Sequence, residues 1–218
     1  MFLHGYLSSK ESFYYQTEYF SSYFKIFAPD LTGFKTRDLP YAYSLADYAR
    51  EVGEYIDGVK KVTGESPSVI AHSFGARILF YLAPIENVDK IVLTGAAGVK
   101  QRKPLKVKLK LLAYKSIKRL FHKKIVAFES ADYKVLSPTM KESFNKIISL
   151  DLTGKLSLIR NRTLIINGDK DTATPPYAAK TIHKKIKGSQ LVFMKNRGHF
   201  CFSEDPVGFN LIVKEFLL

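Results

Sequence analysis

The segment that most constrains the fold is residues 69–75, which read Val-Ile-Ala-His-Ser-Phe-Gly. A short apolar run leads into a turn in which Ala71 and Gly75 flank Ser73, and residues 76–82 then suit a helix. Small residues on both sides of a serine are typical of a sharp strand-to-helix turn, which holds the hydroxyl clear of the backbone as a nucleophile. Alanine stands where glycine is usual, so the pattern alone is also compatible with a simple turn that carries a surface serine.

Two later segments supply partners for this serine. Residues 163–167 and residues 191–194 both read as buried strands, and polar loops follow them with Asp171 in the first and His199 in the second. Loops after the carboxyl ends of strands are where open α/β sheets gather their reactive groups. A serine in such a turn needs a base and an acid that orients the base, in the chain order Ser, acid, His. Ser73, Asp171 and His199 follow that order.

At this point the chain resembles the α/β-hydrolase superfamily, and the resemblance extends from residue 3 to the C-terminus. It implies a mostly parallel central sheet flanked by helices, with a variable cap inserted after the strand that follows the elbow helix. Members of this superfamily hydrolyse esters, lipids, lactones, amides and some carbon–carbon bonds. The matching motifs are His4-Gly5, Ala71-x-Ser73-x-Gly75, Gly168-x-x-Asp171 and Gly198-His199.

The resemblance implies a role for each member of the triad. Ser73 would be the nucleophile, His199 the base that removes its proton, and Asp171 the acid that orients the imidazole. Asp169 competes with Asp171, and the family spacing Gly-x-x-Asp favours Asp171. The oxyanion hole would consist of the backbone amides of the residues that follow the elbow serine and the His-Gly turn. These residues are Phe74 and Tyr6.

Four further histidines compete with His199 for the role of base. His72 adjoins the nucleophile, but in a sharp turn its side chain should diverge from that of the serine, so we expect local packing. His4 belongs to the His-Gly turn, where the family uses it structurally. His122 and His183 lie in lysine-rich segments and read as surface residues.

The sequence predicts neither a metal nor a cofactor. Cys201 is the single cysteine, so no cysteine cluster can hold zinc. The glycines of residues 95–98 are too loosely spaced for a dinucleotide-binding turn. No stretch of 18 apolar residues and no signal peptide is present, so we expect a cytoplasmic protein.

Hydrophobic periodicity alternates between strands and helices, which favours a parallel sheet. We expect residues 1–97 and 161–218 to form the core domain, and residues 98–160 to form a helical cap insertion. Ser44, with Asp47 three residues later, predicts a capping box at the start of a helix. Further expected elements are helices over residues 12–24, from Pro175 and over residues 205–216, and strands over residues 25–28 and 90–94.

The predicted cap is strongly basic. Residues 100–124 hold eleven Lys and Arg and no Asp or Glu, and the whole chain carries a formal charge of +14. One interpretation is a solvated amphipathic helix, and the other is contact with an anionic membrane surface or an acidic substrate. Nucleic acid is not favoured as a partner, because no recognition motif accompanies the charge.

Only three residues precede His4, whereas members of the superfamily carry further strands before this turn. The sequence therefore predicts a short stub of a strand at the centre of the sheet. The predicted function is a serine hydrolase that cleaves a small carboxylic ester or lipid-like acyl substrate. Two alternatives remain open: a hydrolase of carbon–carbon bonds in dienoates or diketones with the same triad, and an inactive homologue that serves as a binding module.

Overall fold

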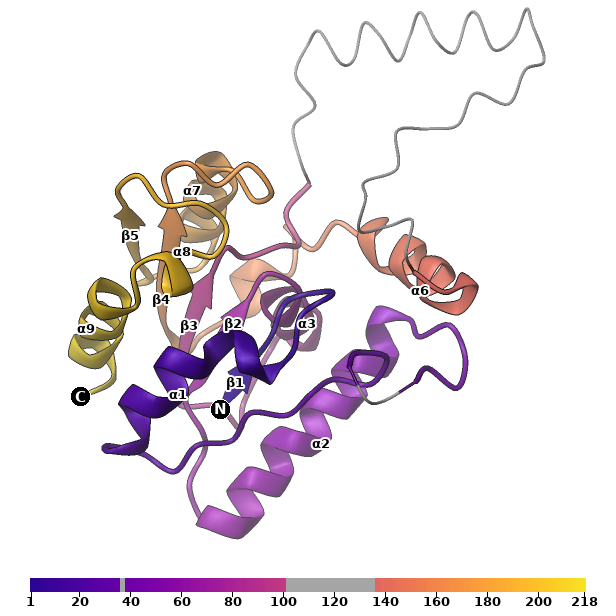
Figure 1. Ribbon diagram of the computed structural model, residues 1–218, viewed down its shortest axis with the longest axis horizontal. Helices are drawn as coiled ribbons and strands as arrows, with labels where there is room; N and C mark the ends of the chain where they lie inside the picture. Colours follow the sequence, from indigo (N-terminus) through magenta and orange to yellow (C-terminus); the bar gives the residue numbers. More distant parts are fainter. Residues whose placement is uncertain (36–37, 101–135) are drawn as a thin grey trace, which may run out of the picture.

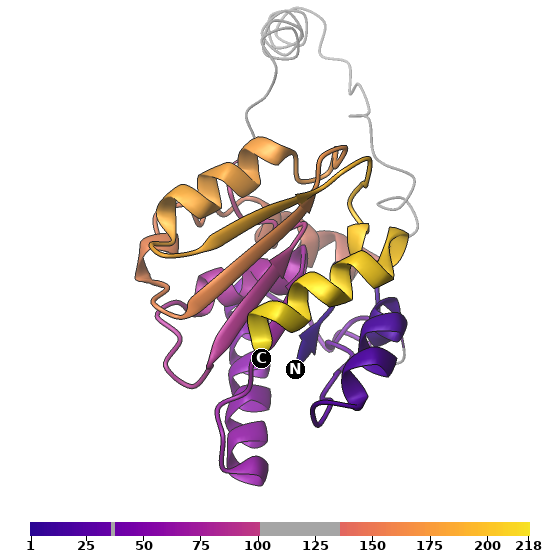
Figure 2. The same ribbon diagram turned by 90° about the vertical axis from the view of Figure 1, so that its left-hand side faces the viewer.

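A computed structural model describes residues 1–35, 38–100 and 136–218. Within these ranges the centre of the molecule is one sheet of five parallel strands in the order β1-β2-β3-β4-β5, flanked by helices (Figures 1 and 2). The predicted mostly parallel α/β architecture is therefore confirmed. The strands are β1 (Phe2–Leu3), β2 (Val69–His72), β3 (Lys90–Thr94), β4 (Arg162–Gly168) and β5 (Gln190–Met194).

Helices cover both faces of the sheet. Side chains of the sheet alternate between two apolar clusters, so that Ile91 and Leu93 of β3 lie in one cluster and Val92 in the other. Strands buried on both faces are typical of parallel sheets. The first cluster includes α2 (Leu45–Thr63), α3 (Phe74–Leu82) and α7 (Pro176–Lys185). The second includes η1 (Lys10–Phe13), α1 (Tyr14–Ser21), α8 (Cys201–Glu204) and α9 (Pro206–Leu217).

Local signals set the starts of two helices. The Ser44 side chain accepts from the Asp47 amide, and the Asp47 carboxylate accepts from the Ser44 amide, so the predicted capping box at α2 is present. Helix α7 begins at Pro176 rather than at Pro175. Pro175 is extended, with ψ of 156°, because a residue that precedes proline is disfavoured in the helical region.

The N-terminal region differs from expectation in two respects. Residues 25–28 are not a strand, because β1 has only two residues and offers few ladder partners; a single bond, from Phe2 N to Phe27 O (2.8 Å), joins the two segments. Strand β1 therefore lies at the edge of the assigned sheet and not at its centre. The helix expected over residues 12–24 is present as η1 followed by α1, which ends at Ser21.

The predicted cap falls partly outside the described residues. Residues 101–135 are not described, and they contain nearly all of the basic stretch. The membrane-surface prediction, which depends on this stretch, therefore lies outside the described residues. The described part of this segment contains α6 (Pro138–Ile148) and the short η2 (Leu156–Leu158), between β3 and β4 in the chain. In the described ranges, no helix combines the length and the apolar character needed to cross a bilayer.

Candidate active site

Ser73 occupies the turn between β2 and α3 in a strained backbone conformation, with φ of 48° and ψ of −100°. Positive φ is uncommon for a residue other than glycine and persists only where neighbouring structure enforces it. Here the Ser73 amide donates to Thr94 O at 3.0 Å, and the Ser73 carbonyl accepts from the amides of Arg77 (3.1 Å) and Ala97 (3.2 Å). The predicted sharp turn is thus held by β3, by α3 and by the loop after β3.

Gly75, the small residue two positions after Ser73, is required by close packing. A Cβ on Gly75 would lie 2.5 Å from the carbonyl oxygen of Leu3, so α3 approaches β1 more closely than any side chain would allow. Ala71, on the other side of the serine, is fully buried in the sheet, and its methyl group fits among apolar neighbours. This explains why alanine replaces the usual glycine at the first position and not at the second.

Asp171 and His199 form a hydrogen-bonded pair in which the imidazole Nδ1 lies 2.8 Å from Asp171 Oδ2. The other carboxylate oxygen accepts from the amides of Ala173 (2.9 Å) and Thr174 (2.8 Å), and the Thr174 hydroxyl donates to Oδ2 at 2.7 Å. Burial raises the pKa of Asp171, but the hydrogen bonds from His199 and Thr174 outweigh burial and hold this pKa below its usual value. The carboxylate is therefore ionised and oriented toward the imidazole.

The two loops that carry this pair are packed backbone to backbone. A Cβ on Gly168, at the end of β4, would lie 2.2 Å from the carbonyl oxygens of Arg197 and Gly198. The amide of Lys170 also donates to Arg197 O at 2.9 Å. Glycine at position 168 therefore lets the loop with Asp171 approach the loop with His199.

The structure distinguishes Asp171 from its competitor. Asp169 Oδ1 is buried without a hydrogen-bond partner, and no contact joins this carboxylate to His199 in the described part of the chain. Ser73 also makes no hydrogen bond to the imidazole among the described residues. Hydrogen bonds of this kind are often long in unliganded proteins and tighten when substrate binds.

The two predicted oxyanion donors belong to segments that lie close to Ser73. Phe74 is the first residue of α3, where a backbone amide has no carbonyl one turn earlier to bind. The His-Gly turn passes close by, since a Cβ on Gly5 would lie 3.6 Å from Ser73 Cβ. The Tyr6 ring packs on the Phe74 ring at 5.2 Å between centroids. The oxyanion hole itself stays a prediction.

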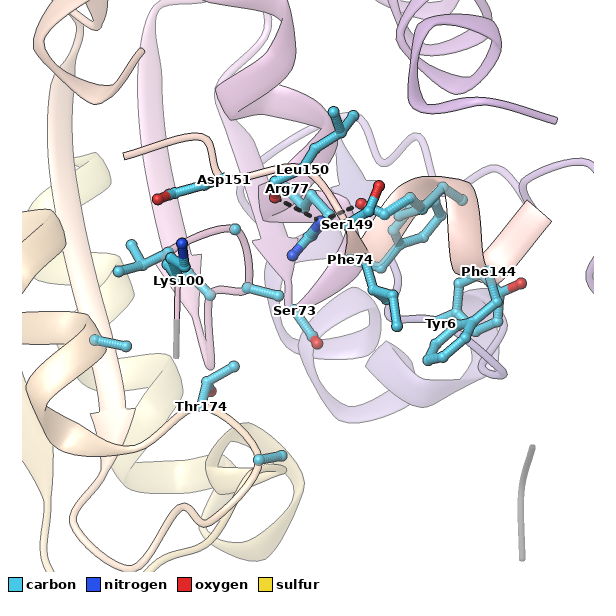
Figure 3. Close-up of a pocket in the computed structure, with 18 of the residues that line it drawn as sticks. Tyr6, Ser73, Phe74, Arg77, Lys100, Phe144, Ser149, Leu150, Asp151 and Thr174 are labelled. Carbon is cyan, nitrogen blue, oxygen red and sulfur yellow. Dashed lines mark hydrogen bonds between the residues drawn. The ribbon is translucent and has the colours of Figure 1, made fainter. Parts of the chain in front are cut away.

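Ser73 opens into a cavity of about 800 Å³ (Figure 3). Several segments contribute to its wall: the residues after β3, the elbow helix α3, the C-terminal half of α6 with the loop after it, and the loop after β4. The wall is mainly apolar and carries a few polar groups, which is typical of small-molecule sites. Apolar and aromatic lining residues include Tyr6, Phe74, Val99, Phe144, Ile147, Ile148 and Leu150.

The comparison with known proteins agrees with this geometry. The sequence pattern that defines the alpha/beta hydrolase family matches residues 1–210. The chain belongs to this family. A nucleophilic serine with an acid and a histidine is typical of the superfamily. The assignment of these three roles to Ser73, Asp171 and His199 stays a prediction.

Relatives of this α/β-hydrolase are distant but extend over most of its length. The AB hydrolase superfamily protein YisY of Bacillus subtilis is 27% identical over 249 residues, which cover 99% of this chain and 90% of that protein. A structure of an esterase from Exiguobacterium antarcticum superposes with a TM-score of 0.77 at 22% identity, covering 100% and 91% of the two chains. A meta-cleavage product hydrolase from Pseudomonas fluorescens gives a TM-score of 0.70 at 21% identity, covering 99% and 89%. These structural likenesses show the fold.

His72, which the sequence assigns to local packing, also contacts the loop of the proposed base. Its Nε2 donates to the backbone carbonyl of His199 at 3.2 Å, and the two rings lie 4.7 Å apart. Burial, with a smaller contribution from nearby His199, lowers the pKa of His72 to about 3. His4 has the expected structural role, since Nδ1 donates to Gly5 O and Nε2 accepts from the Leu31 amide. No sequence signal predicts the contact between His72 and His199, because the two residues are 127 positions apart in the chain.

We expect the neutral, buried His72 to make this α/β-hydrolase sensitive to acid. In the unfolded chain His72 takes up a proton below its ordinary pKa of 6.5, whereas the folded protein does not until about pH 3. Unfolding therefore becomes more favourable as the pH falls, by up to about 1.4 kcal/mol per pH unit. In His72→Gln, which keeps a donor but cannot titrate, the free energy of unfolding between pH 6 and 4.5 should fall less steeply. Urea unfolding of both proteins measures this, and equal slopes would contradict it.

No metal site is evident in the described ranges. They contain no group of three His, Cys, Asp or Glu side chains close enough to hold an ion. Cys201 is buried with its sulfur 3.4 Å from the Thr94 hydroxyl, and burial raises the pKa of its thiol to about 11. At neutral pH this thiol is protonated and unreactive, in line with a packing role.

Proposed function

We propose that this α/β-hydrolase is a serine hydrolase that cleaves a carboxylic ester or lipid-like acyl substrate through an acyl-enzyme on Ser73. The observation that carries this assignment is the hydrogen bond between His199 and the buried, ionised Asp171, together with a strained Ser73 that opens into a mainly apolar cavity. This is the arrangement that serine hydrolysis needs: an oriented base near a nucleophile held clear of the backbone.

The chemistry follows from the tautomer of His199. Because Asp171 accepts the Nδ1 proton, the Nε2 lone pair is available as the base. Ser73 Oγ attacks the carbonyl carbon while Nε2 takes the hydroxyl proton, and the oxyanion is bound by the amides of Tyr6 and Phe74. Nε2 then returns the proton to the departing alcohol. A water molecule, deprotonated by Nε2, hydrolyses the acyl-enzyme and releases the acid.

The cavity favours an acyl substrate. Most of its lining is aliphatic or aromatic, which suits an apolar acyl or alcohol chain. One of the similar solved structures is named an esterase, and another is named a meta-cleavage product hydrolase. The second name corresponds to the alternative chemistry, the hydrolysis of a carbon–carbon bond with the same triad. We further propose that residues 98–160 form a cap over the core of residues 1–97 and 161–218, since α6 from this segment lines the cavity beside Ser73.

A fluorophosphonate probe tests the assignment. We expect one covalent adduct per chain, which peptide mass spectrometry places on Ser73, because the probe reacts with serines that a base activates. The remaining serines of the chain serve as internal controls. An unlabelled protein would instead favour the inactive binding module. In labelled protein, turnover of short p-nitrophenyl esters but not of dienoate ring-fission products would identify the ester chemistry.

A further inference from the structure

Arg77 is a charged side chain in the wall of the cavity that the triad chemistry does not use. It lies on α3, four residues after Ser73, and is only 9% exposed. Burial lowers the pKa of its guanidinium, and the charge of Asp151 offsets this in part. Within the described ranges no carboxylate forms an ion pair with Arg77. A buried cation without an anionic partner is costly for a protein to retain.

The hydrogen bonds of Arg77 to described residues use only one of its nitrogens. Nη1 donates to Ile147 O and to Leu150 O (3.3 Å), at and just beyond the C-terminal end of α6. Figure 3 shows both bonds converging on this atom, while another nitrogen of the guanidinium is drawn on the side of Ser73. Among the described residues, that nitrogen has no hydrogen-bond partner. Anchoring α6 thus leaves part of the guanidinium fork available to a ligand.

The charges around this point favour an anion. Lys100 lines the same cavity and adds a second positive charge. Asp151 is the one carboxylate among the lining residues, and its oxygen accepts from the amide and hydroxyl of Thr153. These hydrogen bonds, with further contributions from the backbone amide and the charge of Lys100, hold the pKa of Asp151 below its usual value. The described wall therefore carries two cations against one anion, so its net charge is positive.

We infer that Arg77 binds a carboxylate of the substrate, so that the esters cleaved at Ser73 carry a second, negatively charged carboxyl group. A guanidinium recognises a carboxylate through charge and directed N–H bonds, and a buried one does so with little screening by water. Ser73 and Arg77 line the same cavity, so one substrate can contact both. A short dicarboxylic acid, esterified at one end, carries the ester and the carboxylate that these two contacts require. This inference rests on the function proposed above.

The test compares two esters that differ only in charge: p-nitrophenyl hydrogen glutarate and its uncharged methyl ester, p-nitrophenyl methyl glutarate. We expect the unmodified protein to prefer the charged ester in kcat/KM. Arg77→Gln keeps an N–H donor for α6 but removes the charge, and should lower the ratio of kcat/KM for charged over uncharged ester by about tenfold to a hundredfold. Arg77→Lys should restore part of the ratio.

Lys146→Gln is the matched control. Lys146 also lies on α6, but outside the cavity, where it pairs with Glu142 at 2.8 Å, so its removal should leave the ratio unchanged. A purely structural role of Arg77 would lower kcat/KM for both esters equally and keep the ratio. That result, with intact turnover of the uncharged ester, would overturn the carboxylate site and leave the proposed function standing.

A binding measurement separates the two hypotheses if neither ester is hydrolysed. Calorimetry with monomethyl glutarate can be carried out on the Ser73→Ala protein, with and without Arg77→Gln. Weaker binding in the double variant would support the carboxylate site independently of turnover. Equal binding, or none in either protein, would exclude it.

Discussion

Replacing Ser73 by alanine should abolish turnover and leave the protein folded. Removing the nucleophile of a serine hydrolase lowers kcat by about five to six orders of magnitude, because the acyl-enzyme forms on its hydroxyl. The Ser73 hydroxyl makes no hydrogen bond among the described residues, and alanine has the same backbone preferences in this turn. We therefore expect the free energy of unfolding to change by less than about 1 kcal/mol.

Steady-state hydrolysis of p-nitrophenyl esters and urea unfolding measure the two parts of this expectation. Ser203→Ala is a suitable control, because Ser203 is exposed on α8, four residues after His199. This control should retain activity and stability. Full esterase activity in Ser73→Ala would refute the mechanism. Lost activity in an unfolded protein would require Ser73→Gly in its place, because glycine removes the hydroxyl and accepts the positive φ of this position.

Much of the fold was predictable because its signals are local. The capping box of Ser44 and Asp47 needs only four consecutive residues, and each of β3, β4 and β5 contains an unbroken apolar run of at least three residues. The turn at Ser73 follows from two small residues, of which Gly75 is required by the approach of α3 to β1. Residues 25–28 show where local signals fail. Their sequence is typical of a strand, but strand formation also depends on a partner strand, and β1 offers only two residues.

The parts of the site that the sequence did not reveal depend on distant contacts. Arg77 reads as one more residue of the elbow helix, and its significance comes from carbonyls of α6 that lie 70 and 73 residues away. His72 likewise reads as a packed side chain, although it donates to the backbone of the His199 loop. Neither contact joins residues that are close in the sequence, so no local pattern predicts it. The loops of Asp171 and His199 were predictable because each follows a strand and carries a family motif.

Replacing Asp171 by asparagine should lower kcat by about four orders of magnitude, with much less effect on binding. The carboxylate accepts the Nδ1 proton of His199 and so keeps Nε2 free to act as the base. An amide nitrogen in place of Oδ2 would donate to Nδ1 and move the ring proton to Nε2, where it blocks proton transfer from Ser73. The amides of Ala173 and Thr174 bind the other oxygen, which asparagine retains, so the loop should stay folded.

Asp169→Asn is the matched comparison, because it makes the same change two residues earlier in the same loop. Asp169 does not contact His199 in the described part of the chain, and its buried Oδ1 has no partner. Asparagine has nearly the same size and alters no described contact of His199, so kcat should change little and stability should not fall. Steady-state kinetics of the two variants, with urea unfolding to establish that both are folded, decides between the carboxylates. If Asp169→Asn lost activity and Asp171→Asn kept it, the orienting acid would be Asp169, and the loop would have to rearrange when substrate binds.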